Sequence, residues 1–162
     1  MARVSSSKTC ILEVEDDEDE IFHLQYAFKQ SGITHPVQVA TDGQQAIDYL
    51  AGAAPFADRN KHPLPWLVLL NLDLRRKTGL EVLEWIRAQP SFRMIVTIVF
   101  AASYHIADAE RANQLCANFF LVKPLDVQER MEIARLLRSS WLVYNQFAPI
   151  GKGNRDTSLS HV

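Results

Sequence analysis

The stretch LVLLNLDLRRKTG, Leu67 to Gly79, decides the fold, because it joins a buried strand to a polar loop. Together with Trp66, its first residues form a continuous apolar run, which is typical of a strand covered on both faces. The loop begins where that run ends. Asn71 stands at the position where a functional carboxylate would be expected, and the nearest acid is Asp73. The chemistry of the loop therefore depends on an amide.

Segments of the same two kinds alternate along the rest of the chain. Short apolar or β-branched runs predict strands at 8–14, 36–41, 66–72, 94–103 and 118–124. Amphipathic segments predict helices at 21–32, 42–52, 78–90, 104–117 and 125–147. Strands that alternate with helices favour a parallel sheet covered on both faces. Right-handed crossovers then give an α/β fold with a flavodoxin-like, doubly wound, five-stranded sheet.

Composition limits the function classes. A chain of 162 residues with 48% hydrophobic and 22% charged residues fits one soluble domain. We expect this domain over residues 1–148, with a core at about 8–142 and a polar tail at 149–162. The net charge of −2 gives no reason to expect nucleic-acid binding. No apolar run approaches about 20 residues, and the N-terminus lacks a secretory signal, so a cytoplasmic protein is expected.

The cysteines do not indicate a metal cage. Cys10 and Cys116 are far apart in the sequence and have no second pair beside them. We expect both to be buried thiols.

Polar residues at three expected strand ends suggest a common site. Glu15 and Asp16 follow the first strand, Asn71 and Asp73 follow the third, and Lys123 ends the fifth. Ligands of doubly wound sheets bind outside the carboxyl ends of the strands. Oxygen ligands there suit Mg²⁺, which binds one or two carboxylates plus water and phosphate. A lysine that faces them suits a phosphoryl oxygen.

These motifs together resemble the receiver domain of two-component response regulators. The segments ILEVEDDEDEIFHLQYAFKQSGI, LVLLNLDLRRKTGLEVLEWIR and ANFFLVKP are similar to its opening, its phosphorylation loop and its fifth strand. The stretches TDGQQAIDYLAG and SSWLVYNQF are similar to the small, stand-alone regulators that pair with phytochrome kinases. The resemblance implies a histidine kinase or a phosphotransfer protein as partner, possible contact with a phytochrome kinase, and no enzymatic activity.

The resemblance also implies a role for each strand-end residue. Glu15 and Asp16 match the acid pair that binds Mg²⁺, and Asp73 matches the residue whose backbone carbonyl is a metal ligand. Asn71 falls on the phosphoacceptor aspartate. Since an amide has no nucleophilic oxygen anion, it cannot form an acyl phosphate. With one negative charge fewer, the site should bind Mg²⁺ weakly or not at all.

The resemblance places three further residues in the phosphate pocket. Lys123 matches the lysine that grips the phosphoryl group, and Phe120 falls on the aromatic that changes rotamer with it. Ala101 falls on the threonine or serine whose hydroxyl bonds the phosphoryl group, and alanine has no hydroxyl. Phosphorylation thus lacks both its acceptor carboxylate, at Asn71, and its hydroxyl, at Ala101. These two losses predict an atypical receiver, or pseudo-receiver, which acts through protein contacts without aspartyl phosphorylation. In one version of this pocket, Asn71 donates its amide to Asp16 and accepts from Lys123.

Two other readings remain open. The chain could be an ordinary phosphoacceptor regulator, with Asn71 an engineered replacement of aspartate or with Asp73 as the acceptor. It could also be a flavodoxin-like enzyme or nucleotide binder, but no glycine-rich phosphate loop follows the first strand, and no nucleophile–base pair is evident.

The C-terminal part of the last expected helix carries apolar residues beyond the reach of the sheet. They are Trp141, Leu142, Val143, Tyr144 and Phe147. Apolar side chains there need a partner or a fold-back onto the domain. A homodimer interface at Trp141, Leu142, Tyr144 and Phe147 is the favoured interpretation.

Overall fold

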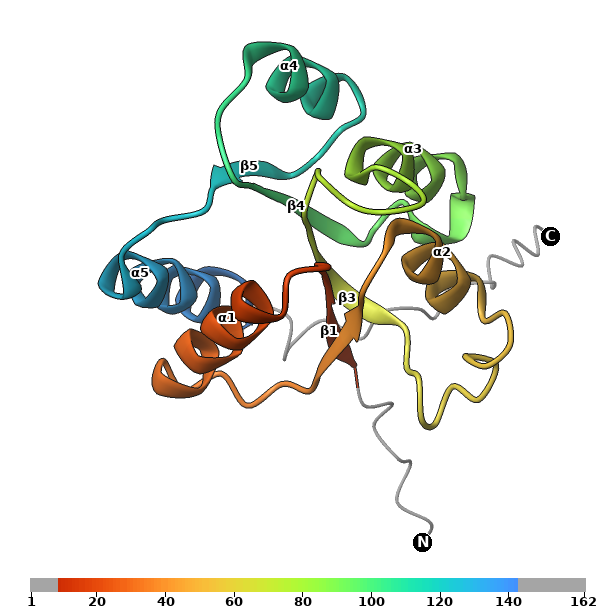
Figure 1. Cartoon of the computed structure of the whole chain (residues 1–162). Coiled ribbons are helices and arrows are strands. Elements are labelled where there is room, and N and C mark those ends of the chain that lie inside the picture. Colours follow the sequence, from red (N-terminus) through yellow and green to blue (C-terminus); the bar gives the residue numbers. More distant parts are fainter. Residues whose placement is uncertain (1–8, 143–162) are drawn as a thin grey trace, which may run out of the picture.

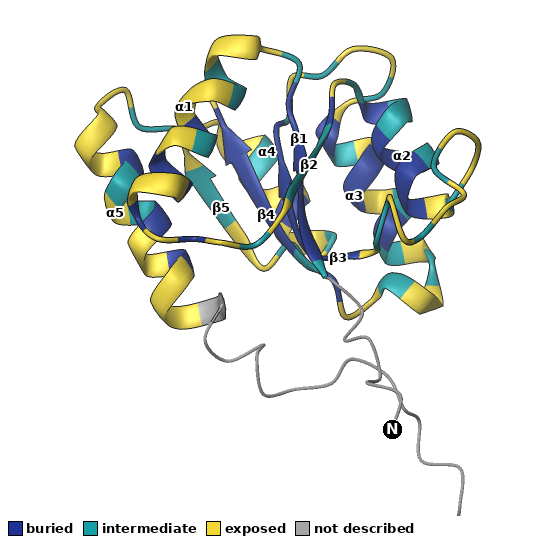
Figure 2. Ribbon diagram, turned by 90° about the horizontal axis from the view of Figure 1, so that it is seen from below, coloured by how far each residue is buried: buried dark blue, intermediate teal, exposed yellow. Residues whose placement is uncertain are grey.

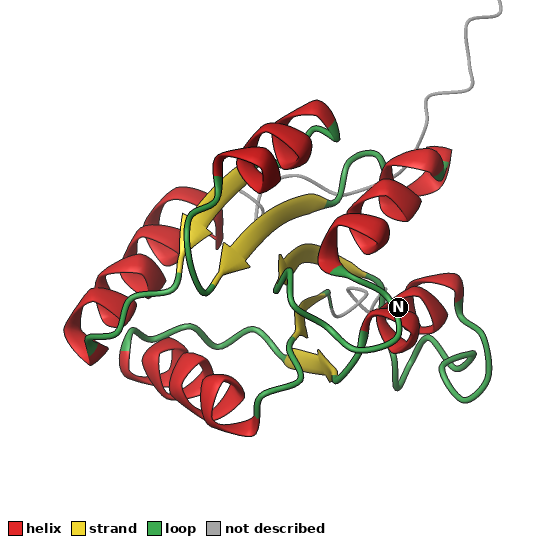
Figure 3. Ribbon diagram, turned by 45° about the horizontal axis from the view of Figure 1, so that its top comes forward, coloured by secondary structure: helices red, strands yellow, loops and turns green. Residues whose placement is uncertain are grey.

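The computed structural model describes residues 9–142, which form a five-stranded parallel sheet flanked by helices on both sides (Figures 1 and 3). The strand order is β2-β1-β3-β4-β5, so the chain reverses its winding direction once, between β2 and β3. The strands are β1 Cys10–Val14, β2 Val37–Ala40, β3 Pro65–Leu70, β4 Val96–Ala101 and β5 Phe119–Val122. The predicted flavodoxin-like, doubly wound fold is confirmed.

Helices alternate with these strands. They are α1 Glu18–Gln30, α2 Gly43–Ala51, α3 Gly79–Ala88, α4 Ile106–Gln114 and α5 Val127–Leu137, with a short 3₁₀ turn η1 Pro90–Phe92 after α3. Side chains cap the start of several helices: Asp17 for α1, Asp42 for α2, Thr78 with Glu81 for α3, and Asp126 for α5. Such caps satisfy backbone N–H groups that have no partner inside the helix. Part of the acidic run after β1 therefore starts a helix.

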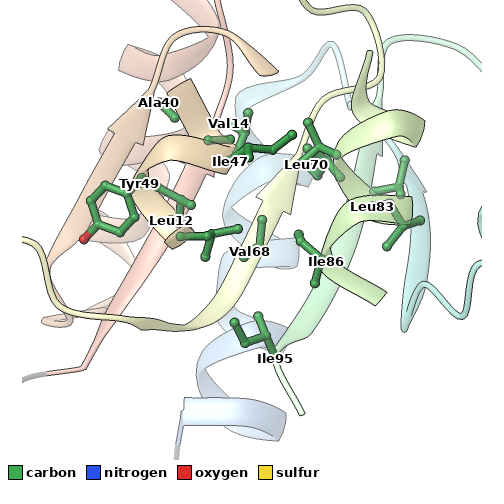
Figure 4. Packing of buried hydrophobic residues seen from close by; sticks show 14 of the residues in the cluster. Leu12, Val14, Ala40, Ile47, Tyr49, Val68, Leu70, Leu83, Ile86 and Ile95 are labelled. Carbon is green, nitrogen blue, oxygen red and sulfur yellow. The ribbon is translucent and has the colours of Figure 1, made fainter. Parts of the chain in front are cut away.

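Two hydrophobic clusters cover the two faces of the sheet. One joins Leu12, Val14, Val68 and Leu70 to α2 and α3, as Figure 4 shows. The other joins Ile11, Leu67 and Leu69 to side chains of α1 and α5. All residues of β1 and β3 are buried, because both faces of these central strands are covered (Figure 2). This burial accounts for the continuous apolar runs in the sequence.

The last helix differs from the prediction. The α-helix ends at Leu137, and the chain continues as a π-helical turn, η2 Arg138–Leu142. Of the predicted dimer residues, Tyr144 and Phe147 lie outside the described residues, as does the expected tail. The predicted strand 118–124 is also less buried than expected, because β5 is the edge strand of the sheet that the described residues form.

The cysteines also differ in part. Cys10 is buried, as predicted, but Cys116 is exposed, so the prediction for it was wrong. Cys116 follows α4 with a positive φ of 57°, in a sharp turn that leads the chain into β5 at the surface. In the part of the chain that the structure describes, no helix is long and apolar enough to cross a membrane.

Candidate functional site

The polar residues predicted from the strand ends meet at the carboxyl edge of the sheet. Parallel strands present their carboxyl ends at the same edge, so the loops after β1, β3 and β5 converge there. Gly79 keeps the loop after β3 tight, since a Cβ atom at this position would lie 2.1 Å from the backbone oxygen of Asn71. The backbone N–H of Asn71 bonds the oxygen of Val14 at 3.0 Å. Asn71 is thus held directly beside the end of β1.

Glu15 is the centre of the site and is almost completely buried. Its Oε2 atom accepts a short, charge-assisted hydrogen bond from the ammonium group of Lys123, whose side chain is 8% exposed. Its Oε1 atom accepts a bond of 3.0 Å from the side-chain amide of Asn71. The backbone N–H groups of Asp16 and Asp17 also bond Oε1, at 3.1 and 3.2 Å. Both oxygens of this carboxylate are therefore already occupied by protein donors.

The predicted hydrogen bonds of Asn71 were wrong in their partners. Asn71 donates to Glu15 and to the backbone oxygen of Asp73, at 3.1 Å, and makes no bond to Asp16. Lys123 bonds Glu15 instead of donating to the amide oxygen. The reason is electrostatic: an ammonium group gains more from a carboxylate than from a neutral amide.

Three features bear on whether the site fits a cation. Among the described residues, the Oδ1 atom of Asn71 is buried and has no hydrogen-bond partner, so one hard oxygen is available. The carboxylate of Asp16, however, turns toward Arg75, with Oδ2 3.6 Å from Nε. Within residues 9–142, no group of three or more His, Cys, Asp or Glu side chains is arranged to hold a metal ion. The oxygen atoms available to a cation therefore carry less negative charge than an acid pair and an acceptor aspartate would provide.

A second ion pair supports the first and was not predicted from the sequence. Arg130 of α5 makes a bidentate contact with Glu20 of α1, at 2.8 and 3.1 Å. Glu20 also lies 3.9 Å from the ammonium group of Lys123. The hydrogen bond from Arg130 is the main reason that the pKa of Glu20 is lowered. A charged residue on the inner side of α5 is the signal that could have revealed this pair, but its partner is 110 residues away.

Glu13 adds a second buried carboxyl group below Glu15. It is 2% exposed, and its Oε2 atom accepts a long bond of 3.5 Å from Gln25. Burial is the largest cause that raises its pKa from 4.5 to about 8, and the charges of Glu15 and Glu20 add to the effect. Lys123 and Gln25 act in the opposite direction. The raised pKa favours the protonated form of Glu13 near neutral pH.

The two predicted switch positions lie on β4 and β5. Ala101 is buried and has only a methyl side chain, and its backbone oxygen bonds the N–H of Lys123 at 2.7 Å. Phe120 is partly buried and packs against the cluster shown in Figure 4. Its ring makes an edge contact with that of Tyr104, at 5.9 Å between centroids. The aromatic side chain is thus held on the inner side of β5.

The mouth of the site carries exposed charges. Asp73 has an exposed side chain, and only its backbone oxygen contacts Asn71. Arg75 and Arg76 reach across to the neighbouring loops, where Arg75 pairs with Asp16 and Arg76 lies 3.3 Å from Asp42. These contacts join the loop after β3 to the loops after β1 and β2.

The geometry and the fold define a class: a doubly wound domain whose acidic, amide and lysine side chains meet beyond β1, β3 and β5. The family model described as response regulator receiver domain matches residues 11–135. The chain therefore belongs to the response regulator receiver domain family. As a family, receiver domains bind Mg²⁺ or Mn²⁺ and interact with histidine kinases or phosphotransfer proteins.

Known proteins similar to this chain agree with that assignment. The probable methanogenesis regulatory protein FilR2 from Methanothrix harundinacea is 31% identical, over 84% of this chain and 85% of its own. Response regulator Rcp1 from Synechocystis is 29% identical, over 88% and 95%. Its crystal structure in a Mn²⁺-bound form superposes with a TM-score of 0.74 at 29% identity, covering 83% of this chain and 94% of that one. The phosphorylated cyanobacterial phytochrome response regulator RcpA gives 0.77 at 29% identity, covering 84% and 95%. The predicted relation to phytochrome-associated regulators is confirmed at this level.

Proposed function

We propose that this protein is a pseudo-receiver: a signalling domain that acts through protein contacts and does not form an aspartyl phosphate. The observation that supports this proposal most directly is the set of bonds around Glu15. The amide of Asn71 and the ammonium group of Lys123 both bond this carboxylate. The lysine that would hold a phosphoryl group is thus paired internally, and the acceptor position offers a neutral amide.

We further propose that divalent cations bind weakly. Asp16, the Oδ1 atom of Asn71 and the backbone oxygen of Asp73 are the candidate ligands, while Glu15 is occupied by protein donors. Mg²⁺ gives up its water reluctantly and depends on carboxylate charge. Asn71 removes one such charge, and Arg75 competes for Asp16.

The proposed partners are a histidine kinase of the phytochrome type or a phosphotransfer protein, and a second copy of this chain. Similarity to Rcp1 and RcpA supports the histidine kinase as partner. The apolar residues Trp141, Leu142, Tyr144 and Phe147 support a homodimer formed by the C-terminal segment. A Trp141→Asp variant with an unchanged molar mass in light scattering would contradict the homodimer.

The main test is phosphorylation in vitro. Wild-type protein, Asn71→Asp and Asn71→Asp/Ala101→Thr are incubated with acetyl phosphate and Mg²⁺ and then weighed by intact-protein mass spectrometry. We expect no phosphoryl adduct on the wild type and an adduct on the double variant, because it restores both the acceptor and the hydroxyl. An adduct of one phosphoryl group on the wild-type chain would refute the proposal.

The same experiment tests the alternative in which the protein is an ordinary phosphoacceptor regulator. If Asp73 were the acceptor, wild-type protein would be phosphorylated and Asp73→Asn would not. The exposure of Asp73 speaks against that role, because Glu15 is buried and only the backbone oxygen of Asp73 contacts Asn71. Beryllofluoride binding, followed by tryptophan fluorescence, provides an independent readout that needs no covalent bond.

A further inference from the structure

The outer face of α1 carries a stripe of four exposed side chains: Asp19, Phe22, Tyr26 and Lys29. The spacing of three, four and three residues keeps all four on one side of a helix. Phe22 is 66% exposed and Tyr26 is 45% exposed. Their rings stack on each other with centroids 6.3 Å apart. The stripe thus has an aromatic centre and opposite charges at its two ends.

Folding of the protomer does not use this stripe. The opposite face of α1 carries the buried residues Leu24, Ala27 and Phe28, which pack beneath the helix in the cluster shared with α5. The charged contact to α5 is made by Glu20. Among the described residues, Asp19 and Lys29 have no side-chain ion pair. The stripe is therefore available to a partner.

The order of residues along the stripe is complementary to itself. When two copies of one helix pack antiparallel, residues equally distant from the crossing point face each other. If the two helices cross at the level of Leu24 along their axes, Phe22 of one copy faces Tyr26 of the second copy. Asp19 of each copy then faces Lys29 of the other copy, so the twofold symmetry gives two ion pairs, one at each end of the contact. A twofold interface requires this kind of self-complementary surface.

We propose that a second copy of this chain binds at the α1 stripe through an antiparallel α1–α1 contact. Aromatic pairs with offset or edge geometry would form its centre, and two Asp19–Lys29 ion pairs would set its register. A contact between single helices buries less than the roughly 1,200 Å² of a stable interface. The association is therefore expected to be weak and to depend on protein concentration.

This contact does not rest on the pseudo-receiver proposal or on the C-terminal homodimer. The stripe involves neither the site around Glu15 nor any residue of the C-terminal segment. With two different twofold surfaces, each copy could contact two neighbours, and assembly would then continue beyond the dimer at high concentration. A Trp141→Asp background removes the C-terminal contact and leaves the α1 contact to be measured alone.

Charge exchange tests the proposed register. In the full-length Trp141→Asp background, Asp19→Lys and Lys29→Glu are each measured by sedimentation velocity across a concentration series. Each single variant places two like-charged pairs in the interface and should weaken self-association about tenfold or more. The double variant Asp19→Lys/Lys29→Glu restores opposite charges and should recover most of the association. An equimolar mixture of the two single variants should associate more strongly than either alone.

Two controls separate this effect from helix stability. Lys61→Glu makes the same charge change as Lys29→Glu, but on an exposed loop, and should leave association unchanged. Both stripe substitutions oppose the dipole of α1, so the double variant cannot recover helix stability; circular dichroism reports whether the variants fold. Phe22→Ser should abolish the association, whereas Met94→Ser, which removes an 86% exposed apolar side chain elsewhere, should not.

The outcomes are decisive. Recovery in the double variant and in the mixture supports the antiparallel register. Single variants that associate as the parent does, or a double variant that remains monomeric, overturn it. If the stripe variants instead lose binding to a purified histidine kinase while self-association stays unchanged, the stripe belongs to that partner, and the proposal is wrong.

Discussion

Replacing Asn71 by aspartate tests the hydrogen bonds at the centre of the site. The side-chain amide donates to Glu15 at 3.0 Å and to the backbone oxygen of Asp73 at 3.1 Å. A carboxylate cannot donate, so both bonds are lost, at about 1 kcal/mol each. The new charge also lies near that of Glu15, which at 3 Å costs about 5 kcal/mol at an effective dielectric constant of 20. Attraction to Lys123 offsets part of this repulsion.

We therefore expect Asn71→Asp to unfold about 2–4 kcal/mol more easily than wild type in the absence of divalent cations. For a domain of this size, that lowers the melting temperature by roughly 6–12 °C. Mg²⁺ should recover much of the loss, because it neutralises the added carboxylate. At one hundred times its dissociation constant, a bound ion contributes about 2.7 kcal/mol.

Thermal unfolding by calorimetry, with EDTA and with a Mg²⁺ series, measures both effects. Asn60→Asp is the matched control, since it makes the same change at an exposed loop residue and should be nearly neutral. An Asn71→Asp variant as stable as wild type in EDTA, or equal stabilisation of the two proteins by Mg²⁺, would contradict the proposed roles of these hydrogen bonds and charges.

Three further substitutions test the surroundings of the site. Because the pKa of Glu13 is raised to about 8, its stabilising contribution is complete below about pH 4.5 and is lost as pH rises through 8. Glu13→Gln should remove this loss, so that the variant exceeds wild type by up to a few kcal/mol at pH 9 in urea unfolding; parallel stability curves would contradict this. Gly79→Ala places a Cβ atom 2.1 Å from the oxygen of Asn71 and should cost about 2–4 kcal/mol, whereas an unchanged urea midpoint would show that the loop yields freely. Arg130→Met leaves Glu20 without its bidentate partner and should cost about 3 kcal/mol at pH 7. Since the pKa of Glu20 is lowered, this difference should shrink as pH falls below its ordinary range, and a constant difference would argue against the ion pair.

Local patterns were sufficient to predict the fold. The run from Trp66 to Leu70 and the buried residues Leu12 and Val14 belong to central strands, whose two-sided burial requires apolar side chains at successive positions. The predicted helices 42–52 and 78–90 begin at the residues that cap α2 and α3, Asp42 and Thr78, because helix starts depend on residues only a few positions apart. The end of the last helix was less predictable, since a π-helical turn after Leu137 changes the backbone without changing the apolar pattern.

The sequence by itself determined the parallel sheet and the residues that meet at its carboxyl edge, because strand periodicity and loop position are local properties. Only the tertiary structure decided how those residues pair. Lys123 bonds Glu15 across 108 residues, and Arg130 bonds Glu20 across 110. Such pairings depend on the relative charge and distance of atoms that meet only after the sheet has formed. For the same reason, the stripe on α1 became visible as a surface only when the buried face of that helix was known.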